Sequence, residues 1–487
     1  MPDLLADNVK YLRGRVGSAS ISNSLLAELW QQVADGGGEV LRISPHRTVW
    51  KCQPPAAVDA AEHDAWLLKV YHPQRRAEAL RRLFKAAPAM REEENWRLLA
   101  QRIGIQFALA AEQVCSDVGM LARPYWSGVR ASDSLAKKKS VQAAKAMDRL
   151  ASGLALLHRA HWTDSDLDAN DLLFVDDFDG MLLPLDLGHA QVSLMKPPAE
   201  AVYADLQQLL ASLPPEIAMQ MAVVLLKEEH HGSWLKGYAP ARLVERALQA
   251  RTEHAWKRSR RCLRTVSDFD FDTGSSRRQG ADALPDFANA SPIKSGPRST
   301  LYRAADTAWK FYPRDGVGQK LRKNLHMGPA CLAFRRLYFL ELLGFQVAPV
   351  QAWQSADGGE WLATQWLQGT EPSREQLPLV AAYLAKLHAF GITLRDAKPA
   401  NFVLDGDQQL HLIDGDGIRP QLSNAWRDVA RLIAEVEADS EMEAICLQRY
   451  ADERNHIHSA PEAKIGVEEL RRRSAKDAAY FRQLLQP

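Results

Sequence analysis

Two neighbouring stretches decide the fold and the chemistry of this 487-residue chain: LRDAKPANFVL (Leu394–Leu404) and LHLIDGDG (Leu410–Gly417). Asp396 and Asn401 are five residues apart, and Asp414 follows after one intervening strand pair. Phosphoryl transfer needs a carboxylate near the acceptor hydroxyl and oxygen ligands that hold Mg²⁺ on the nucleotide phosphates. We therefore expect Asp396 to be the catalytic base and Asn401 and Asp414 to hold the metal.

The same chemistry needs a fixed cation on the phosphates, because catalysis here depends on positioning and charge neutralisation. Lys310, in the strand-like segment AWKFYPR, is the candidate for this role, and Lys398 is placed to reach the transferred phosphate. The segment GPRSTLYR has two interpretations. It is either a turn that covers the phosphates, with Ser299 and Thr300 as nucleotide-binding residues, or a plain hairpin.

The deciding stretches have counterparts in the first half of the chain, in the same order. LALLHRAHWTDSDLDANDLLF (Leu154–Phe174) matches LAKLHAFGITLRDAKPANFVL (Leu384–Leu404). Upstream of each, LLKVYHP matches AWKFYPR, and downstream LPLDLG matches LIDGDG. Because the matches keep one order along the chain, we interpret it as a duplicated domain.

Each half runs from strands through a helix to further strands and then helices. This order predicts an α+β domain with a small β-rich lobe and a larger helical lobe. Between the halves, residues 265–290 are rich in Asp, Ser and Gly and have little helical period, which is typical of a linker. The expected domains are therefore residues 1–264 and 291–487, joined by the linker 265–290.

The first copy retains the acidic positions of the site with different neighbours. Asp166 stands at the catalytic-base position, and Asp171 and Asp186 stand at the two metal positions. Asp171 replaces the asparagine of the second copy, and Asp168 replaces its lysine, so the loop is unusually acidic for a partner of polyphosphate. Two interpretations stay open: a degenerate or regulatory domain, or a second active site in which an aspartate ligates Mg²⁺.

The RDAKPAN, DGD and WKFY segments resemble the protein-kinase-like superfamily, with RDAKPAN as the catalytic loop and DGD in place of the usual Asp-Phe-Gly. More narrowly, GITLRDAKPANFVL and the compact halves resemble the bacterial lipopolysaccharide kinase family, which phosphorylates heptose or Kdo of the lipid A–core. The resemblance implies two tandem bilobal kinase-like domains, ATP and Mg²⁺ as cofactors, and a lipopolysaccharide core glycolipid or its oligosaccharide as acceptor. It also implies that Asp428 braces the catalytic loop.

An acid that pairs with the nucleotide lysine is the part of this pattern that the second copy lacks. Kinases pair that lysine with a glutamate on the next helix. In the first copy, Lys69 is followed by Glu93 at the expected place, and the glutamates on either side of Glu93 leave the choice open. In the second copy, Lys310 has Ala333 there. Either the register differs, another acid reaches Lys310, or the lysine is held unconventionally.

Two other functions stay open besides a sugar kinase. RDAKPAN with Lys398 is close to the loop of protein Ser/Thr kinases, so a protein hydroxyl is an alternative acceptor. Ala333 and Asp171 each depart from the pattern of an active site. These departures favour, as a further alternative, a non-catalytic tandem pseudokinase that serves as a scaffold in envelope assembly.

Charge composition argues against nucleic acid as a partner. Lys and Arg number 61 against 60 Asp and Glu, so the net charge of +1 gives no overall field that recruits nucleic acid. The basic stretches 75–85, 319–328 and 257–261 lack the interleaved aromatic residues of a nucleic-acid groove. They are either contacts to an anionic membrane surface or glycolipid phosphates, or solvated helix faces.

Location and redox state follow from the cysteines and the termini. The five cysteines are scattered, which predicts neither a disulfide framework nor a zinc site and favours a reducing compartment. The first residues lack the order of a signal peptide. We expect a cytoplasmic protein, with at most peripheral contact at the inner face of the cytoplasmic membrane.

Overall fold

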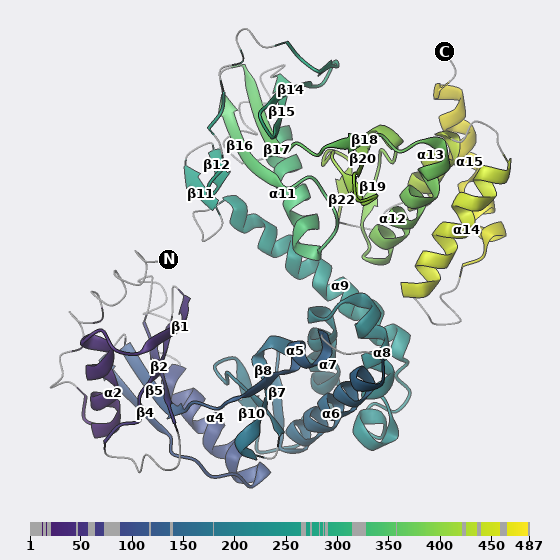
Figure 1. Ribbon diagram of the computed structural model, residues 1–487. Coiled ribbons are helices and arrows are strands. Elements are labelled where there is room, and N and C mark those ends of the chain that lie inside the picture. Colours follow the sequence, from purple (N-terminus) through teal and green to yellow (C-terminus); the bar gives the residue numbers. More distant parts are fainter. Residues whose placement is uncertain are drawn as a thin grey trace. The chain divides into compact units, whose positions relative to one another are not determined.

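The computed structural model divides into two compact units, Met1–Leu243 and Val244–Pro487 (Figure 1). Both units combine β-sheets with helices, which confirms the predicted α+β class. The structure describes residues 12, 16, 21–44, 47–56, 64–72, 88–115, 118–136, 140–178, 180–263, 269–272, 275–281, 283–285, 287, 291–313, 328–356, 358–420, 425–435, 440–457 and 465–485.

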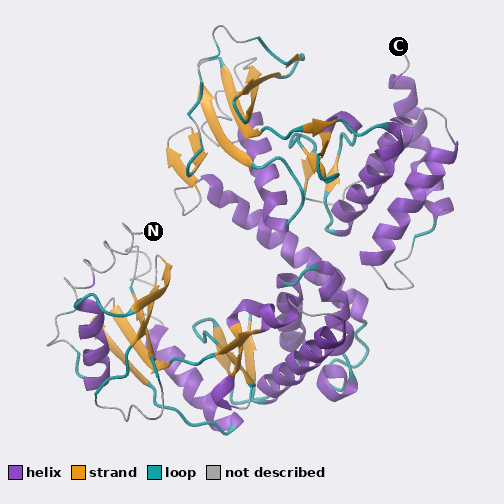
Figure 2. Ribbon diagram, in the orientation of Figure 1, coloured by secondary structure: helices purple, strands orange, loops and turns teal. Residues whose placement is uncertain are grey.

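A five-stranded antiparallel sheet with strand order β1-β2-β3-β5-β4 forms the first part of the first unit (Figure 2). Helices α2 (Ser24–Ala34) and α4 (Pro88–Ile103) pack on it. The strands are β1 (Glu39–Ser44), β2 (Arg47–Cys52), β3 (Trp66–Tyr71), β4 (Ala110–Cys115) and β5 (Val118–Pro124).

Strand β3 is the middle strand of this sheet, and all six of its residues are buried. Trp66, Leu68 and Val70 pack in one hydrophobic cluster with residues of α2. Tyr71 packs in another cluster, with Ala89 of α4. Because successive side chains of a strand point to opposite faces, Lys69 shares the α4 face with Tyr71. The sheet therefore directs Lys69 toward α4 and away from α2.

The rest of the first unit is mostly helical and contains two small sheets. The helical segments are α5 (Ala131–Ala136), α6 (Ser140–Arg159), η2 (Ala169–Asp171), η3 (Asp176–Phe178), α7 (Ala199–Ser212), α8 (Pro215–Leu225), η4 (Glu228–Gly232) and the start of α9 (Pro240–Ser259). The strands are β6 (Gly128–Arg130), β8 (Leu172–Val175) and β9 (Met181–Pro184) in one sheet, and β7 (Trp162–Asp164) with β10 (Ala190–Val192) in the other.

A seven-stranded sheet with order β11-β12-β16-β17-β15-β14-β13 opens the second unit. Helix α11 (Pro329–Leu343) packs against its central strands, which include β15 with Lys310. The strands are β11 (Phe269–Asp272), β12 (Ser275–Arg278), β13 (Lys294–Ser295), β14 (Thr300–Ala304), β15 (Thr307–Pro313), β16 (Val350–Ala356) and β17 (Gly359–Gln365). The short helix η5 (Arg260–Leu263) precedes them.

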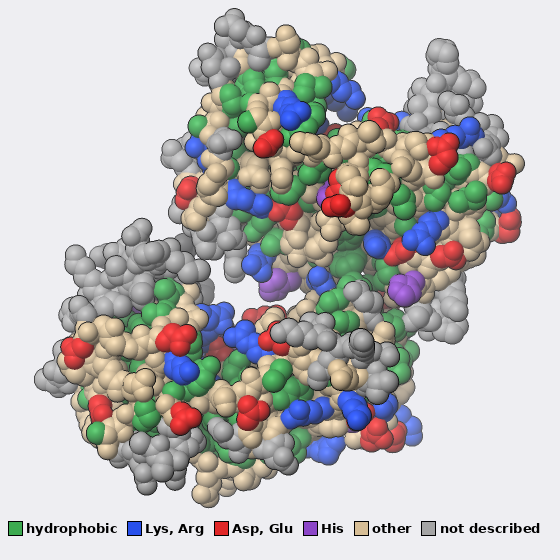
Figure 3. All heavy atoms as spheres, in the orientation of Figure 1, with side chains coloured by type: hydrophobic (Ala, Val, Ile, Leu, Met, Phe, Trp, Pro, Cys, Tyr) green, Lys and Arg blue, Asp and Glu red, His purple; other side chains and the backbone are tan. Residues whose placement is uncertain are grey.

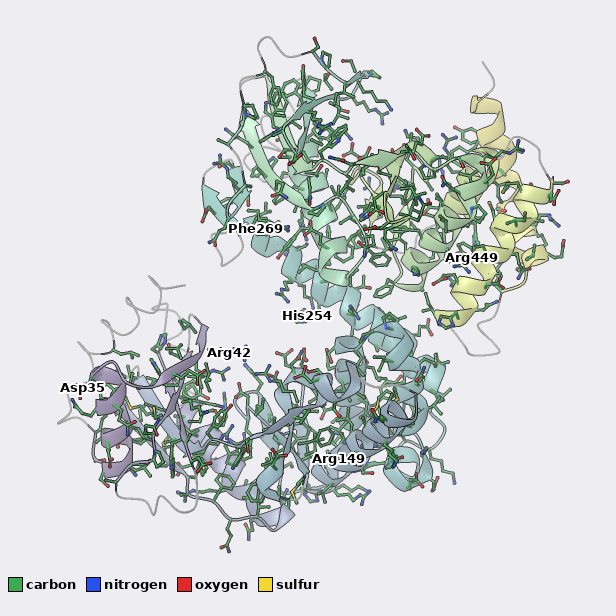
Figure 4. The ribbon with its side chains drawn as sticks, viewed as in Figure 1. Asp35, Arg42, Arg149, His254, Phe269 and Arg449 are labelled. Atoms are coloured by element: carbon green, nitrogen blue, oxygen red, sulfur yellow. The ribbon has the colours of Figure 1, made fainter. Side chains whose placement is uncertain are left out.

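Residues 265–290 do not form the predicted linker where the structure describes them. Strand β11 pairs with β12, and β12 pairs with β16 through Ser276 and Trp353. Phe269, labelled in Figure 4, lies edge-on against Phe334 and Tyr338 of α11. The alternation in FDFD gives this segment a face to bury, and that periodicity outweighs its loop-like composition. The two compact units accordingly divide at residue 243, before the predicted boundary at 264.

The remainder of the second unit places a helical region after two small sheets. Helix α12 packs on α14, and α13 packs on α15. The helical segments are η6 (Arg374–Gln376), α12 (Leu377–Ala389), η7 (Pro399–Asn401), α13 (Ala425–Glu435), α14 (Ser440–Ile457) and α15 (Val467–Leu485). The strands are β18 (Gly369–Thr370), β20 (Phe402–Asp405) and β21 (Leu410–Leu412) in one sheet, and β19 (Thr393–Leu394) with β22 (Ile418–Arg419) in the other.

The order of elements repeats between the units. In the first unit it runs β2-β3-α4-β4-β5 and then α6-β7-η2-β8-η3-β9-β10-α7, in which η3 has no counterpart among the described residues of the second. In the second it runs β14-β15-α11-β16-β17 and then α12-β19-η7-β20-β21-β22-α13. This correspondence agrees with the duplication inferred from the sequence and places the candidate residues of both copies on equivalent elements.

Surface charge is mixed where the structure describes it, and acidic and basic side chains are interspersed over the face shown in Figure 3. The basic stretch 75–85 and residues 319–327 lie outside the described residues. In the third stretch, Lys257, Arg258 and Arg260 are exposed at the end of α9 and in η5. Among the described residues, no helix is both long enough and apolar enough to cross a membrane.

Four cysteines, Cys52, Cys262, Cys331 and Cys446, are buried and free of disulfide bonds. Burial raises the pKa of the Cys52, Cys262 and Cys446 thiols to about 12. These side chains therefore behave as small hydrophobic residues of the core, with very little reactive thiolate at neutral pH.

Candidate active site

Lys310 lies in an acidic cluster of the second unit. Its Nζ is 3.0 Å from Oδ2 of Asp414 and 3.0 Å from Oδ2 of Asp416. Burial alone would lower the pKa of Lys310, but the two carboxylates outweigh burial and raise its pKa above the ordinary value. The lysine is therefore held as a cation directly beside the predicted metal ligand Asp414.

Tyr312, two residues after Lys310 in β15, completes this cluster. Its hydroxyl donates to Oδ1 of Asp416 at 2.9 Å, and the backbone N–H of Asp416 donates to Oδ1 of Asp414 at 3.0 Å. Burial and then Asp414 raise the pKa of Asp416. Burial and then the two carboxylates raise the pKa of Tyr312 well above its ordinary value, so its hydroxyl stays protonated and donates.

Asp396 is the centre of the contacts in the predicted catalytic loop. Lys398 Nζ lies 2.8 Å from Oδ2 of Asp396, and Arg431 Nε of α13 lies 3.8 Å from Oδ1 of the same carboxylate. Asn401 Nδ2 donates to the backbone carbonyl of Asp396 at 2.7 Å. The side chain of Asp396 is 47% exposed, so an acceptor hydroxyl has access to it.

A backbone hydrogen bond joins this loop to the lysine cluster. The N–H of Ile413 donates to the carbonyl of Asn401 at 2.9 Å, which places the next residue, Asp414, beside the loop. The predicted base, metal ligands and nucleotide lysine thereby come from separate elements to one region of the second unit. Asp396 and Asn401 come from the segment before β20, Asp414 from the loop after β21, and Lys310 from β15.

Asp428 of α13 holds the start of the catalytic loop through hydrogen bonds. It is 1% exposed, and its Oδ2 accepts hydrogen bonds from the backbone N–H of Leu394 at 2.6 Å and from Nε2 of His388 at 3.1 Å. Nδ1 of His388 lies 2.7 Å from the hydroxyl of Tyr450. These contacts are those expected of a residue that braces the catalytic loop.

Asp205 of α7 makes the same contacts in the first unit. Its Oδ2 accepts from the backbone N–H of Asp164 at 2.9 Å and lies 3.2 Å from Nε2 of His158. Nδ1 of His158 lies 2.9 Å from Nε2 of His231. The support of the loop is therefore shared by both units, whatever each loop does.

Ser299 and Thr300 lie at the hairpin between β13 and β14. The N–H of Gly296 donates to the carbonyl of Ser299 at 3.0 Å, which closes the turn. Among the described residues, no hydrogen bond or ion pair joins either side chain to the Lys310 cluster. These contacts are those of a hairpin, the second of the two interpretations, and a role of Ser299 and Thr300 in binding phosphates stays a prediction.

Lys69 occupies the corresponding cluster of the first unit. Its Nζ is 2.5 Å from Oε1 of Glu92 in α4 and 3.4 Å from Oδ1 of Asp186. The hydroxyl of Tyr71 donates to the other oxygen of Glu92. Lys69 and Glu92 form a buried pair, 3% and 0% exposed. In this unit the lysine thus has an acid from the helix as well as one from the loop.

The acid that contacts Lys69 is Glu92, one residue before the predicted Glu93. Oε1 of Glu93 instead accepts from Arg97 at 2.6 Å, one turn along the helix. The prediction counts back from the glycine that ends each helix, and that distance differs by one residue between the copies. The distance from the lysine is shared: Glu92 follows Lys69 by 23 residues, as Ala333 follows its own lysine.

Two cations cover Asp186 in the first unit. Arg47 of β2 forms an ion pair with Oδ2 of Asp186, while Lys69 contacts Oδ1. Burial alone would raise the pKa of Asp186, but Lys69 and Arg47 hold its pKa well below the ordinary value. The second unit has Ser299 at the sequence position that matches Arg47. The predicted metal carboxylate of the first unit is therefore already occupied by protein cations.

The other two predicted site acids of the first unit, Asp166 and Asp171, lie between β7 and β8. Asp166 is exposed, and its N–H donates to Oδ1 of Asp164 at 3.0 Å. The N–H of Leu185 donates to the carbonyl of Asp171 at 2.7 Å, as Ile413 does at Asn401. Burial and nearby carboxylates raise the pKa of Asp171, against the opposing charge of Arg42 on β1 (Figure 4). Burial raises the pKa of Asp164 to about 6.

Some of the contacting residues were not among the predicted site residues, although the sequence carries a signal for them. Asp416 stands in the DGD segment itself, and a tyrosine follows each lysine by two residues, in KVY and in KFY. These tyrosines, Tyr71 and Tyr312, lie on the same face as the lysine because strands repeat every two residues. Arg47 has no such signal, because the second copy has a serine at that position.

No protein-family model matches this sequence, and no curated protein matches it closely enough to count as a relative. Three solved structures of WbdD are similar to part of the chain. A 2.2 Å crystal structure has 18% identity and a TM-score of 0.27, and it covers 38% of this chain and 45% of WbdD.

The other two comparisons are equally weak. A co-crystal structure of WbdD with the kinase inhibitor LY294002 has 17% identity, a TM-score of 0.27, and covers 38% of this chain and 44% of WbdD. A structure described as the bifunctional kinase-methyltransferase WbdD has 18% identity, a TM-score of 0.25, and covers 37% and 42%. The chain spans less than half the length of these proteins. Similarities at this level carry no argument about its activity.

Proposed function

We propose that this protein is an ATP-dependent phosphotransferase that phosphorylates a hydroxyl group, built from two tandem bilobal kinase-like domains and catalytic mainly in the second. The observation that carries the proposal is the backbone hydrogen bond from Ile413 to Asn401. It sets the loop of Asp396 and Asn401 against Asp414, whose carboxylate contacts Lys310. A base, metal ligands and a phosphate-binding cation are the parts that phosphoryl transfer requires.

The donor atoms of this site suit Mg²⁺. Asn401 commits its amide N–H to the carbonyl of Asp396, which leaves Oδ1 as a ligand atom, and Asp414 supplies a carboxylate. Mg²⁺ prefers hard oxygen ligands and is usually bound by one or two protein groups together with substrate phosphates. When bound, the ion would neutralise charge on the β- and γ-phosphates, while Lys310 supplies a fixed cation beside them.

The exposed carboxylate of Asp396 is the proposed acceptor of the proton from the attacking hydroxyl. Lys398 and Arg431 place two positive charges beside it, at 2.8 and 3.8 Å. Negative charge on the transferred phosphoryl group would arrive at this place, and preorganised cations stabilise such charge. Loss of Lys398 is therefore proposed to slow transfer rather than to weaken ATP binding.

The acceptor that we propose is a sugar hydroxyl, of heptose or Kdo in the lipopolysaccharide core. What supports it is the likeness of GITLRDAKPANFVL and of the compact halves to the lipopolysaccharide kinase family. The glycolipid would be met at the inner face of the cytoplasmic membrane, with no nucleic acid involved. The exposed Lys257, Arg258 and Arg260 would contribute to peripheral contact with anionic headgroups.

The first domain is proposed to be degenerate and to serve a regulatory or scaffolding role. Arg47 and Lys69 both contact Asp186, the oxygen donor that a metal would need, and the Arg47–Asp186 pair is largely buried. Displacing a buried partner from such a pair is costly, because an uncompensated charge remains. Asp171 in place of an asparagine and Asp168 in place of a lysine also work against bound polyphosphate.

Paired variants test the proposal. We expect Asp396→Ala to abolish phosphate transfer from labelled ATP to purified core oligosaccharide, and Asp166→Ala to leave it intact. Mass spectrometry of core sugars should show the loss of one phosphate in a strain carrying Asp396→Ala only. Labelling of protein and never of glycolipid would replace the sugar kinase with a protein Ser/Thr kinase. Absence of any Mg²⁺–ATP thermal shift in the wild type would leave a pseudokinase scaffold.

A further inference from the structure

Asp416 contacts Lys310 and Tyr312 together, in the same way that a helix glutamate contacts the matching pair in the first unit. Oδ2 of Asp416 lies 3.0 Å from Lys310 Nζ, and Oδ1 accepts from Tyr312 at 2.9 Å. In the first unit, the two oxygens of Glu92 accept from Lys69 and Tyr71. One carboxylate thus bridges the lysine and the tyrosine of a strand in both units, but it comes from different elements.

The loop after Asp186 in the first unit is folded like the loop after Asp414 in the second. The N–H of Gly188 donates to Oδ1 of Asp186 at 2.9 Å, and the N–H of Asp416 donates to Oδ1 of Asp414 at 3.0 Å. A Cβ on Gly188 would lie 3.7 Å from the hydroxyl of Tyr71. A side chain at this loop position would therefore begin within contact distance of the tyrosine hydroxyl. The first unit has no side chain there, and the second has a carboxylate.

The helix position shows the opposite exchange. The first unit has Glu92 in α4, whereas the second has Ala333 in α11, each 23 residues after its lysine. Among the described residues of α11, no acid contacts Lys310. A Cβ on Gly415 would lie only 2.7 Å from the carbonyl oxygen of Ala333. The loop lies directly against the helix there, because neither residue has a bulky side chain, and this brings Asp416 to the lysine.

We infer that Asp416 is the positioning residue for Lys310 and takes over the role of the missing helix glutamate. A helix acid with a loop glycine in one unit corresponds to a helix alanine with a loop acid in the other. The consequence is that the lysine of the second unit is held by the same loop that supplies the metal ligand Asp414, while α11 supports that loop through its backbone and through Arg336, which donates to the carbonyl of Asp416 at 3.0 Å. This inference rests on the proposed function, since it assigns a residue to the same nucleotide site.

The test measures Mg²⁺–ATP binding to the full chain by isothermal titration, and Lys310→Ala identifies the share of binding that belongs to the second unit. We expect Asp416→Asn to weaken that share by roughly tenfold or more, as for loss of a hydrogen bond to a charged group. In the Lys310→Ala background, Asp416→Asn should have no further effect, because its action passes through the lysine. Asp407→Asn, an exposed aspartate of the same unit, is the matched control.

The reciprocal exchange provides the rescue. Asp416→Gly combined with Ala333→Glu recreates the arrangement of the first unit and should recover affinity that Asp416→Gly alone loses. Thermal unfolding checks that each variant folds. If the combined variant does not fold, the comparison of Asp416→Asn with and without Lys310→Ala decides the matter by itself.

The outcomes separate the inference from the function on which it rests. Binding that Lys310→Ala removes and Asp416→Asn leaves unchanged would overturn the inference alone. An Asp416→Asn effect that persists in the Lys310→Ala background would also overturn it, because Asp416 would then act on another group, such as the metal. Absence of Mg²⁺–ATP binding in the wild type would refute the proposed function, and the role of Asp416 with it.

Discussion

Replacing Asp428 by alanine removes the one oxygen on which two buried donors converge. Oδ2 of Asp428 accepts from Leu394 N–H at 2.6 Å and from Nε2 of His388 at 3.1 Å, and all three groups are buried. Each donor left without an acceptor costs about 1–3 kcal/mol. We therefore expect Asp428→Ala to lower the free energy of unfolding by about 3–5 kcal/mol, as for a broken buried pair.

Asparagine at the same position separates charge from geometry. Because both donors use a single oxygen, the amide oxygen of Asp428→Asn can take its place and accept both hydrogen bonds. Only the extra strength of bonds to a charged acceptor is lost, so we expect a cost of about 1 kcal/mol. Equal losses for Asn and Ala would refute this reasoning, since they would show that the charge of Asp428 matters more than its position.

Amide hydrogen exchange and unfolding provide the assay. The peptide covering residues 392–404 contains the Leu394 N–H, and its exchange in Asp428→Ala should be roughly a hundredfold faster than in the wild type, as a loss of about 3 kcal/mol implies. Phosphate transfer should fall with it, because the loop of Asp396 loses its anchor. Asp428→Asn should keep most of both properties.

Asp205→Ala is the matched variant in the first unit, since Asp205 holds Asp164 N–H and His158 in the same way. We expect a comparable loss of stability in that unit, with faster exchange around Asp164 and phosphate transfer retained. Loss of transfer in Asp205→Ala with retention in Asp428→Ala would place catalysis in the first unit and contradict the assignment above.

Three further outcomes follow from the described contacts. Arg47→Ser should open Asp186 to a divalent cation, so that Mn²⁺ raises the unfolding temperature of the variant in an Asp414→Asn background; no Mn²⁺ effect would show that Arg47 does not block the site. Gly415→Ala should destabilise the second unit by about 1–3 kcal/mol, since its Cβ would lie 2.7 Å from a helix carbonyl; a neutral effect in urea unfolding would show that loop and helix separate easily. Burial raises the pKa of Asp164 from 3.8 to about 6, so its contribution to stability is fully present below pH 3.8 and is lost as the pH rises through 6. The stability of Asp164→Asn should therefore rise by about 2–3 kcal/mol relative to that of the wild type between about pH 4 and pH 8. A constant difference in stability across that range would contradict the raised pKa.

The residues that depend on sequence spacing were the predictable part of the site. Asp396 and Asn401 are fixed by a short loop, and Asn401 contacts the backbone of Asp396 within five residues. Lys310 and Asp414 are far apart in sequence. Their positions, on a strand and on the loop after a later strand, nevertheless predict that the two side chains lie close together. The α+β class follows in the same way, from the alternation of strand-like and helical segments.

The remaining contacts depend on three-dimensional positions that the spacing of residues along one copy does not reveal. A one-residue difference at the end of a helix is enough to select Glu93 in place of Glu92, since adjacent residues of a helix point about 100° apart. Arg47 reaches Asp186 across the fold from β2, and nothing in its neighbourhood marks it. The strands around Phe269 lie in a segment whose Asp, Ser and Gly content favours a loop, although the FDFD alternation indicates a strand.

Because four native cysteines are buried, labels on introduced cysteines can be used to measure the distance between the two units. Cys52, Cys262 and Cys446 have pKa values raised to about 12, and Cys331 is buried with them, so thiol reagents should ignore all four in the folded protein. With Cys115 replaced by serine, one surface cysteine introduced into each unit would be labelled selectively with a fluorophore. Energy transfer between two such dyes, with and without Mg²⁺–ATP, would then report whether nucleotide at one unit changes the distance to the other.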